Sequence, residues 1–186
     1  MGLADLVDQK RTILMEGALG ERLKREYHIR FDEYVAMAGL IYSLQGMRAL
    51  SVLWKGYIDI AGKYHFPLLV TTPTRRANCD RITASRFSEK LFTDNVRFLR
   101  NIQRNSGIEM YVGGLMGCRG DAYTAEGALS EAEAYAFHSW TAEHFLEAGA
   151  DFLYAGIMPS LPEAAGLARA ADGVNLPYII SITADD

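Results

Sequence analysis

Two adjacent arginines, Arg75 and Arg76, are the first candidates for chemistry in this sequence. They follow an apolar run, Pro67 to Thr72, and Pro73 separates them from it. A guanidinium group presents parallel N–H donors, so such a pair can bind a carboxylate or a phosphate in fork geometry. A solvent-exposed pair is the more common arrangement, and it is our default interpretation.

The two cysteines, Cys79 and Cys118, are the candidates for metal binding. They do not form a CxxC pair, and neither has a His or Cys neighbour at ligand spacing. We therefore interpret both as small apolar residues and predict no metal site within residues 1–186. The glycine-rich segment from Gly113 to Gly120 lacks the Lys-Ser/Thr pair of a P-loop and the G-x-G-x-x-G register, which argues against a nucleotide site.

The composition is that of an ordinary globular chain, with 186 residues, 49% of them hydrophobic. This length favours one domain over residues 1–186. The net charge is -4 and basic runs are absent, so we expect a small-molecule or protein partner rather than a nucleic acid. The first 17 residues lack the pattern of a signal peptide or membrane anchor, and there is no long apolar window. Together with the two cysteines, these features lead us to expect a cytoplasmic location without membrane association.

Short apolar runs alternate with segments of helical periodicity, the pattern of βα units around a parallel sheet. The predicted strands are Thr12 to Gly17, Pro67 to Thr72, Met110 to Gly114, Asp151 to Ile157 and Tyr178 to Thr183. The predicted helices are Glu21 to Tyr27, Tyr34 to Ile60, Phe87 to Gln103, Glu131 to Ala148, and a segment capped by Ser160 that runs to Ala171. Gly149 is the expected C-cap of the fourth helix, and Glu163 the capping-box partner of Ser160.

Five βα units fit two α/β architectures. One is a partial (β/α)₈ barrel, which closes with eight strands, usually over about 250 residues. The other is an open, doubly wound five-stranded sheet. Periodicity does not distinguish between them.

Several motifs, in order along the chain, resemble the homocysteine S-methyltransferase family. Ile13 to Leu23 (ILMEGALGERL) resembles the first-strand motif L-L-D-G-G/A-M-G-T-x-L, and Thr71 to Asn78 (TTPTRRAN) resembles T/E-T-N-T-F/Y-x-A-N/S. Tyr111 to Tyr123 is similar to the third-strand V-A-G-S-I-G-P and its loop. The segments FH, EAGADFL and PSLPEA between Phe137 and Ala164 resemble the most diagnostic family motif, and Pro177 to Asp185 is similar to P-V-x-x-S-F-x-x-x-D.

The resemblance implies a (β/α)₈ barrel in which zinc holds the homocysteine thiol as a thiolate that attacks a methyl group. It places the three zinc cysteines after the sixth strand and near the eighth, beyond Asp186, so we expect no cofactor in residues 1–186. It also implies substrate-binding positions at Glu16, Gly17, Thr72 and Thr74, whereas catalytic residues stay unassigned. Glu16 replaces the family's Asp that binds the substrate amino group, although backbone amides of the Gly17 to Gly20 turn are an alternative partner.

Other positions depart from the family pattern. Its fourth-strand Glu, a second anchor for the substrate ammonium, falls on Gly156, its second-strand Asn falls on Pro73, and an aromatic residue falls on Arg75. Loss of a buried charge partner costs about 2–5 kcal/mol of binding free energy. His138, where the family also has His, is expected to be structural.

Three functions are therefore open for this chain. It is part of a homocysteine S-methyltransferase-like enzyme and inactive alone, a divergent binding or assembly module, or a barrel enzyme that uses Glu16, Arg75 and Arg76 on another small acidic substrate. In each case unpaired strand edges predict self-association or pairing with a completing chain. The sequence does not indicate the methyl donor.

Overall fold

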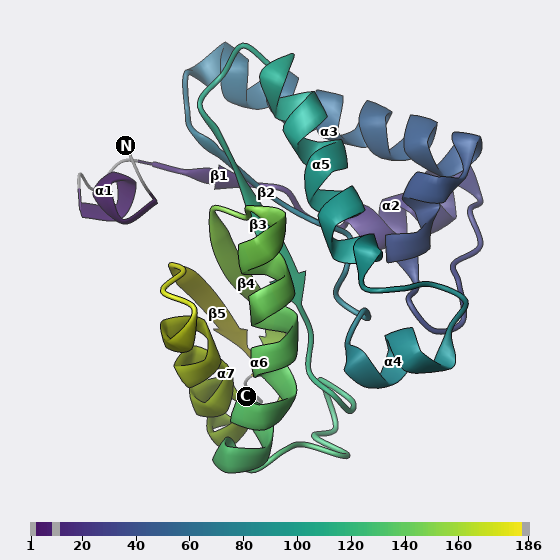
Figure 1. Ribbon diagram of the computed structural model, residues 1–186. Coiled ribbons are helices and arrows are strands. Elements are labelled where there is room, and N and C mark those ends of the chain that lie inside the picture. The colour runs from purple at the N-terminus through teal and green to yellow at the C-terminus, as the bar shows by residue number, and fades with distance from the viewer. Residues whose placement is uncertain (1–2, 9–11, 184–186) are drawn as a thin grey trace.

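The computed structural model describes residues 3–8 and 12–183. Its five strands are β1 (Leu14–Met15), β2 (Leu68–Thr71), β3 (Met110–Met116), β4 (Phe152–Met158) and β5 (Tyr178–Ile182). They form one parallel sheet in the order β1-β2-β3-β4-β5. The strands curl into a half-barrel, with helices between them (Figure 1). The predicted partial barrel is thus confirmed, because a doubly wound sheet would reverse its strand order.

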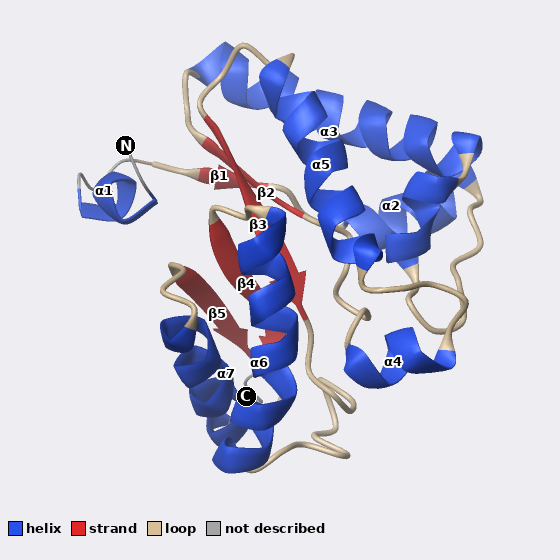
Figure 2. Cartoon of the chain, in the orientation of Figure 1, coloured by secondary structure: helices blue, strands red, loops and turns tan. Residues whose placement is uncertain are grey.

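Helix α1 precedes the first strand, whereas the other helices lie between successive strands along the chain and cover the outside of the sheet (Figure 2). They are α1 (Leu3–Asp8), α2 (Leu19–Tyr27), the 3₁₀ helix η1 (Met37–Tyr42), α3 (Leu44–Tyr64), α4 (Cys79–Ala84), α5 (Lys90–Arg104), α6 (Glu131–Ala148) and α7 (Leu161–Gly173). Helix α3 packs against β2, α5 and α6 pack against β3, and α7 packs against β4 and β5. Within the described residues, no helix is long and apolar enough to cross a membrane.

Strand residues divide between the two faces of the sheet by the alternation of the pleat. Leu68, Val70, Val112 and Leu153 point outward into the large core shared with the helices. Their neighbours point inward and form a second apolar cluster on the concave face: Ile13, Met15, Leu69, Tyr111, Phe152, Tyr154 and Ile179, with Leu3 of α1. The inner cluster is the layer that would fill a closed barrel, and here it is only partly buried.

Two consecutive glycines of β3 allow aromatic rings to pack on both faces of the strand. A Cβ atom at Gly113 would collide with the ring of Phe152 on the inner face, and one at Gly114 with the ring of Phe145 from α6. This close packing accounts for the paired glycines without a nucleotide site.

The predicted strands and most predicted helices are present, with two corrections. The segment Tyr34 to Ile60 is not one helix, because Ser43 is extended and separates η1 from α3; its hydroxyl accepts from the Gly46 amide and caps α3. Ser160 does cap α7, but Glu163 does not complete the capping box, since its carboxylate accepts from Arg119 and Leu129 instead. Gly149 is the C-cap of α6, at φ 77°. Residues 184 and 185 of the fifth-strand motif lie outside the described residues.

Candidate functional site

A cavity of about 620 Å³ opens at the carboxyl ends of the strands, where barrel enzymes bind their substrates. Its wall comes from the end of β1 with the turn into α2, the segment 31–37, the end of β2 with the β2–α4 loop, the ends of β3 and β4, and the β3–α6 loop. The residues used below are Glu16, Gly17, Arg75, Arg76, Tyr123, Tyr154 and Gly156. Glu16 and Gly17 of the predicted substrate positions therefore line this cavity.

Glu16 has one carboxylate oxygen bound and the other free. Oε1 accepts hydrogen bonds from the Thr71 amide at 2.7 Å and the Thr71 hydroxyl at 2.6 Å. Oε2 is buried and has no hydrogen-bond partner among the described residues. Burial raises the pKa of Glu16 from 4.5 to about 7, against the opposing effect of the Thr71 hydrogen bonds. Thr71 is thus the neighbour that fixes this side chain, in place of the backbone amides of the Gly17 to Gly20 turn.

The turn after Glu16 and the start of α2 form the adjoining part of the cavity wall. Ala18 adopts the left-handed conformation at φ 54° and starts α2 without a side-chain cap. The first three amides of α2 belong to Leu19, Gly20 and Glu21, which all line the cavity and have no hydrogen-bond acceptor in the described residues. Gly17 is exposed, and a Cβ atom there would meet nothing within 4 Å. An anion is favourable at this helix end, next to the carboxylate.

Thr72 and Thr74 do not line the cavity. Both side chains are fully buried, and their hydroxyls lie 2.7 Å apart. The Thr74 hydroxyl donates to the Leu115 carbonyl at 2.8 Å, and the Leu115 amide donates to Thr72 Oγ1 at 3.1 Å. These threonines therefore fasten the β2–α4 loop to β3, and so they position the loop rather than face the cavity.

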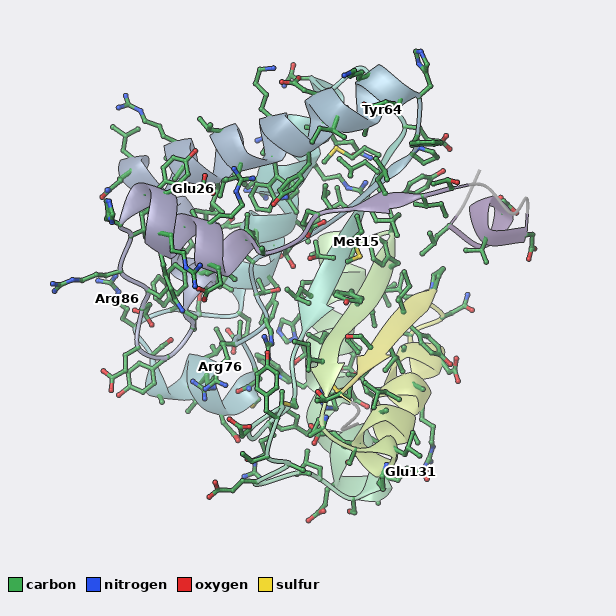
Figure 3. The ribbon with its side chains drawn as sticks, turned by 180° about the vertical axis from the view of Figure 1, so that it is seen from behind. Met15, Glu26, Tyr64, Arg76, Arg86 and Glu131 are labelled. Atoms are coloured by element: carbon green, nitrogen blue, oxygen red, sulfur yellow. The ribbon has the colours of Figure 1, made fainter. Side chains whose placement is uncertain are left out.

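Arg75 and Arg76 leave that loop on the cavity side. Neither guanidinium makes a hydrogen bond or ion pair within the described part of the chain, and Arg75 is half-buried while Arg76 is exposed. The backbone of Arg75 is held close to β3, because a Cβ atom at Gly117 would collide with the Arg75 carbonyl oxygen. In Figure 3, Arg76 lies toward the middle of the molecule, whereas Arg86 lies at its edge.

The end of β4 forms the wall at Gly156. A Cβ atom at Gly156 would come within 2.8 Å of Leu115 Cδ1, the flexible end of a side chain. The next residue, Ile157, has φ 65°, which is rare for a β-branched residue. Its amide donates to Ser181 Oγ at 2.7 Å, where the pairing of β4 with β5 is irregular between Ala155 and Met158. The strained backbone at Ile157 lies directly after Gly156, the position at which the resemblance places a second acid.

The β3–α6 loop, residues 117–130, is anchored by a buried acid that the sequence analysis did not identify as such. Glu163 of α7 is fully buried and accepts from the amides of Arg119 and Leu129, each at 3.1 Å. His138 Nε2 lies 3.4 Å from the same carboxylate. Burial acts to raise the pKa of Glu163, but its hydrogen bonds and His138 hold it below the usual range. His138 therefore has a structural environment, as expected, and the loop carries Tyr123 to the cavity wall.

Zinc ligands do not assemble among these residues. In the described ranges, no three His, Cys, Asp or Glu side chains gather into a metal-binding group. Cys118 is buried, its thiol donates to the Gly120 carbonyl at 3.4 Å, and burial raises its pKa, which disfavours the thiolate that binds metal. The residues present do not fit a zinc centre.

The strand order and the curl of the parallel sheet define an α/β-barrel class of fold. The family model for homocysteine S-methyltransferase matches residues 13–186, and the chain belongs to this family. The metallated and oxidized forms of the homocysteine methyltransferase MmuM from Escherichia coli have a similar fold, with TM-scores of 0.76 and 0.77 at 20% identity. They cover 99% and 96% of this chain, which spans 67% and 64% of theirs. No curated protein matched in the corresponding search.

Proposed function

We propose that this chain forms the amino-acid-binding part of a homocysteine S-methyltransferase site, and that its Glu16 binds the substrate's ammonium group. The free, buried Oε2 of Glu16 beside the cavity is the observation that carries the proposal. A buried carboxylate oxygen without a hydrogen-bond donor is costly, and an ammonium group would supply the donor that Oε2 lacks. The uncapped amides of α2, a few residues further along the chain, are suited to the carboxylate on the same substrate carbon.

The proposed reaction is transfer of a methyl group to the homocysteine sulfur. The thiolate sulfur forms a bond to the methyl carbon while the bond from that carbon to the donor breaks, and the electron pair leaves with the donor. Residues 1–186 would hold and orient the amino acid in this scheme. The zinc-binding cysteines implied by the family resemblance would come from outside these residues, so we propose that the chain alone is inactive and works in the cytoplasm.

Titration of the purified chain with L-homocysteine tests the ammonium contact. The control ligand is 4-mercaptobutanoate, which has the same thiol and carboxylate but lacks the ammonium group. We expect saturable binding of homocysteine and roughly 30-fold or more weaker binding of the control, because a buried charge contact contributes about 2–5 kcal/mol. Glu16→Gln should remove the difference between the two ligands, whereas Glu143→Gln, an exposed carboxylate on α6, should preserve it. Equal affinities for both ligands in the unmodified chain would refute the proposal.

A binding or assembly module without catalysis is the second candidate, and Gly156 favours it because the cavity lacks the family's second acid there. The Gly156→Glu substitution distinguishes an amino-acid-binding site from such a module. If the site still holds an amino acid, this substitution should strengthen homocysteine binding by about tenfold or more, since the only close contact of the new Cβ is with the movable end of Leu115. Gly156→Ala controls for the added bulk. No gain over Gly156→Ala would favour the module that does not bind homocysteine.

A further inference from the structure

Tyr57 of α3 makes a contact with the β1–α2 turn that the proposed function does not use. Its hydroxyl donates a hydrogen bond to the Gly17 carbonyl, 40 residues away in the chain. Helices α2 and α3 lie side by side, which brings the two residues together (Figure 1). Gly17 lines the cavity, whereas Tyr57 does not, so Tyr57 reaches the turn from outside the cavity.

The side chain of Tyr57 is itself held in place. It is half-buried and packs against the main core of the molecule. The guanidinium group of Arg22 lies 5.7 Å from the centre of the Tyr57 ring, a favourable cation–π distance. Glu26 in turn pairs with Arg22 at 2.7 Å. The Tyr57 hydroxyl therefore offers a donor at a fixed position.

The hydrogen bond acts on the peptide group between Gly17 and Ala18. A trans peptide group is planar, so its carbonyl and its N–H point in opposite directions. Because Tyr57 binds the Gly17 carbonyl, the Ala18 N–H must point away from Tyr57. This N–H has no hydrogen-bond acceptor among the described residues, and Ala18 lines the cavity next to Glu16.

The backbone of Ala18 by itself opposes this orientation. Its φ of 54° and ψ of 22° lie in the left-handed region, which is unfavourable for a residue with a Cβ atom. Rotation of the planar Gly17–Ala18 peptide by about 180° would bring φ of Ala18 into the ordinary negative range. The rotation would also exchange the positions of the N–H and the carbonyl. The hydrogen bond from Tyr57 stabilises the observed orientation against this change.

We infer that Tyr57 is a positioning residue for the substrate carboxylate, because it keeps the Ala18 N–H turned toward the cavity beside Glu16. A rotated peptide would present the Gly17 carbonyl oxygen there, which repels a carboxylate and attracts an ammonium group. Tyr57 thereby sets the preference for a ligand with a carboxylate without contacting the ligand. The inference rests on the proposed function, since it concerns the carboxylate of the amino acid proposed there.

Binding of L-homocysteine and of 3-aminopropanethiol to the full chain tests this inference. The second ligand has the same thiol and ammonium groups but lacks the carboxylate. We expect homocysteine to bind at least about tenfold more tightly, because hydrogen bonds to a charged group are strong. Tyr57→Phe should remove most of this preference by weakening homocysteine binding only. Tyr64→Phe, at an exposed tyrosine of the same helix, should preserve it.

A rescue variant and a spectroscopic measurement distinguish positioning from a general structural role. Tyr57→Phe/Ala18→Gly should recover part of the preference, because glycine adopts the left-handed conformation without strain. The three-bond coupling between the amide and α protons of Ala18 reports φ, and it should increase in Tyr57→Phe even without ligand. A general structural defect would weaken both ligands equally and would not be rescued, and either result overturns the inference.

The proposed function and this inference fail in different ways. Equal binding of homocysteine and 4-mercaptobutanoate refutes the ammonium contact of Glu16 and leaves the Ala18 coupling as a test of Tyr57. Equal binding of homocysteine and 3-aminopropanethiol to the unmodified chain overturns the role of Tyr57. An unchanged preference together with an unchanged Ala18 coupling in Tyr57→Phe does the same.

Discussion

Glu16 connects the ligand-binding chemistry of this chain to its stability. Its pKa is raised from 4.5 to about 7 by burial, so between these pH values the folded chain keeps a proton that the unfolded chain has released. The free energy of unfolding must therefore fall as pH rises across this window. Above it, the loss in free energy of unfolding that Glu16 causes stays constant. Under the proposed function, ionised Glu16 would be the form that binds the ammonium group, and its formation lowers the free energy of unfolding.

Glu16→Gln removes this titration and should stabilise the chain at neutral pH. Thr71 can still donate to the amide oxygen of the new side chain. The unmodified chain and the Glu16→Gln variant should have equal free energies of unfolding at about pH 4. By about pH 8 the free energy of unfolding of the variant should be higher by up to about 3 kcal/mol. Urea unfolding across this range measures the effect, with Glu143→Gln as the control. A constant difference at every pH would show that Glu16 titrates normally.

The β3–α6 loop shows how one buried side chain positions an element. Glu163 of α7 accepts hydrogen bonds from two amides at the two ends of this loop. Thr183, the residue directly after β5, also holds the loop, because its Oγ1 donates to the Ala122 carbonyl at 3.0 Å. His138 of α6 contacts the same carboxylate. Because the loop brings Tyr123 to the cavity, the order of this wall depends on contacts remote from the ligand.

Glu163→Gln should lower the free energy of unfolding by about 2–3 kcal/mol, because hydrogen bonds to a buried charge are stronger than those to a neutral amide. The amides of Arg119 and Leu129 should also exchange their hydrogens faster, which NMR measures residue by residue. Glu147→Gln, an exposed change on α6, is the control and should have little effect. Unchanged exchange at both amides would mean that the loop is held by other contacts.

The whole molecule is half of a barrel wall. Within the described residues β1 pairs only with β2 and β5 only with β4, so two strand edges are free. In the inner cluster Phe152 is fully buried, whereas Met15, Tyr154 and Ile179 keep part of their surface exposed. Free edges and a partly exposed apolar face are both features that promote association with another chain.

The 186-residue chain should therefore self-associate in solution. Ile182 at the β5 edge is 47% exposed, and Ile182→Lys should reduce the associated fraction because a charged edge strand resists pairing. Val52→Lys places the same charge on α3, where the side chain is 59% exposed, and should not reduce it. Size-exclusion chromatography with light scattering gives the masses. A stable monomer that melts cooperatively would contradict this expectation.

The amino-acid pattern alone located the five strands along the chain and most of the helices, whereas their order in the sheet came from the fold. Apolar runs bounded by Pro67, Pro73 and Gly149 mark element ends through local backbone geometry, which does not depend on distant contacts. The prediction of one helix over Tyr34 to Ile60 was wrong at Ser43. Apolar residues keep their helical spacing on both sides of Ser43, so the periodicity does not reveal that the helix begins anew there. The division of strand residues between the inner and outer faces also follows from the sequence, since side chains alternate along a strand.

The polar contacts of the cavity region depend on the fold and are not visible in the sequence pattern. Glu16 and Thr71 are 55 residues apart in the chain, and Glu163 and Arg119 are 44 apart, so no local pattern pairs them. Thr72 and Thr74 matched a substrate-binding motif, yet the pleat and the loop directed both hydroxyls to β3. Arg75 and Arg76 resembled an ordinary surface pair, and the curvature of the sheet placed them in the cavity that Glu16 lines. Burial and charge at a site depend on which segments converge there, and that is a property of the fold.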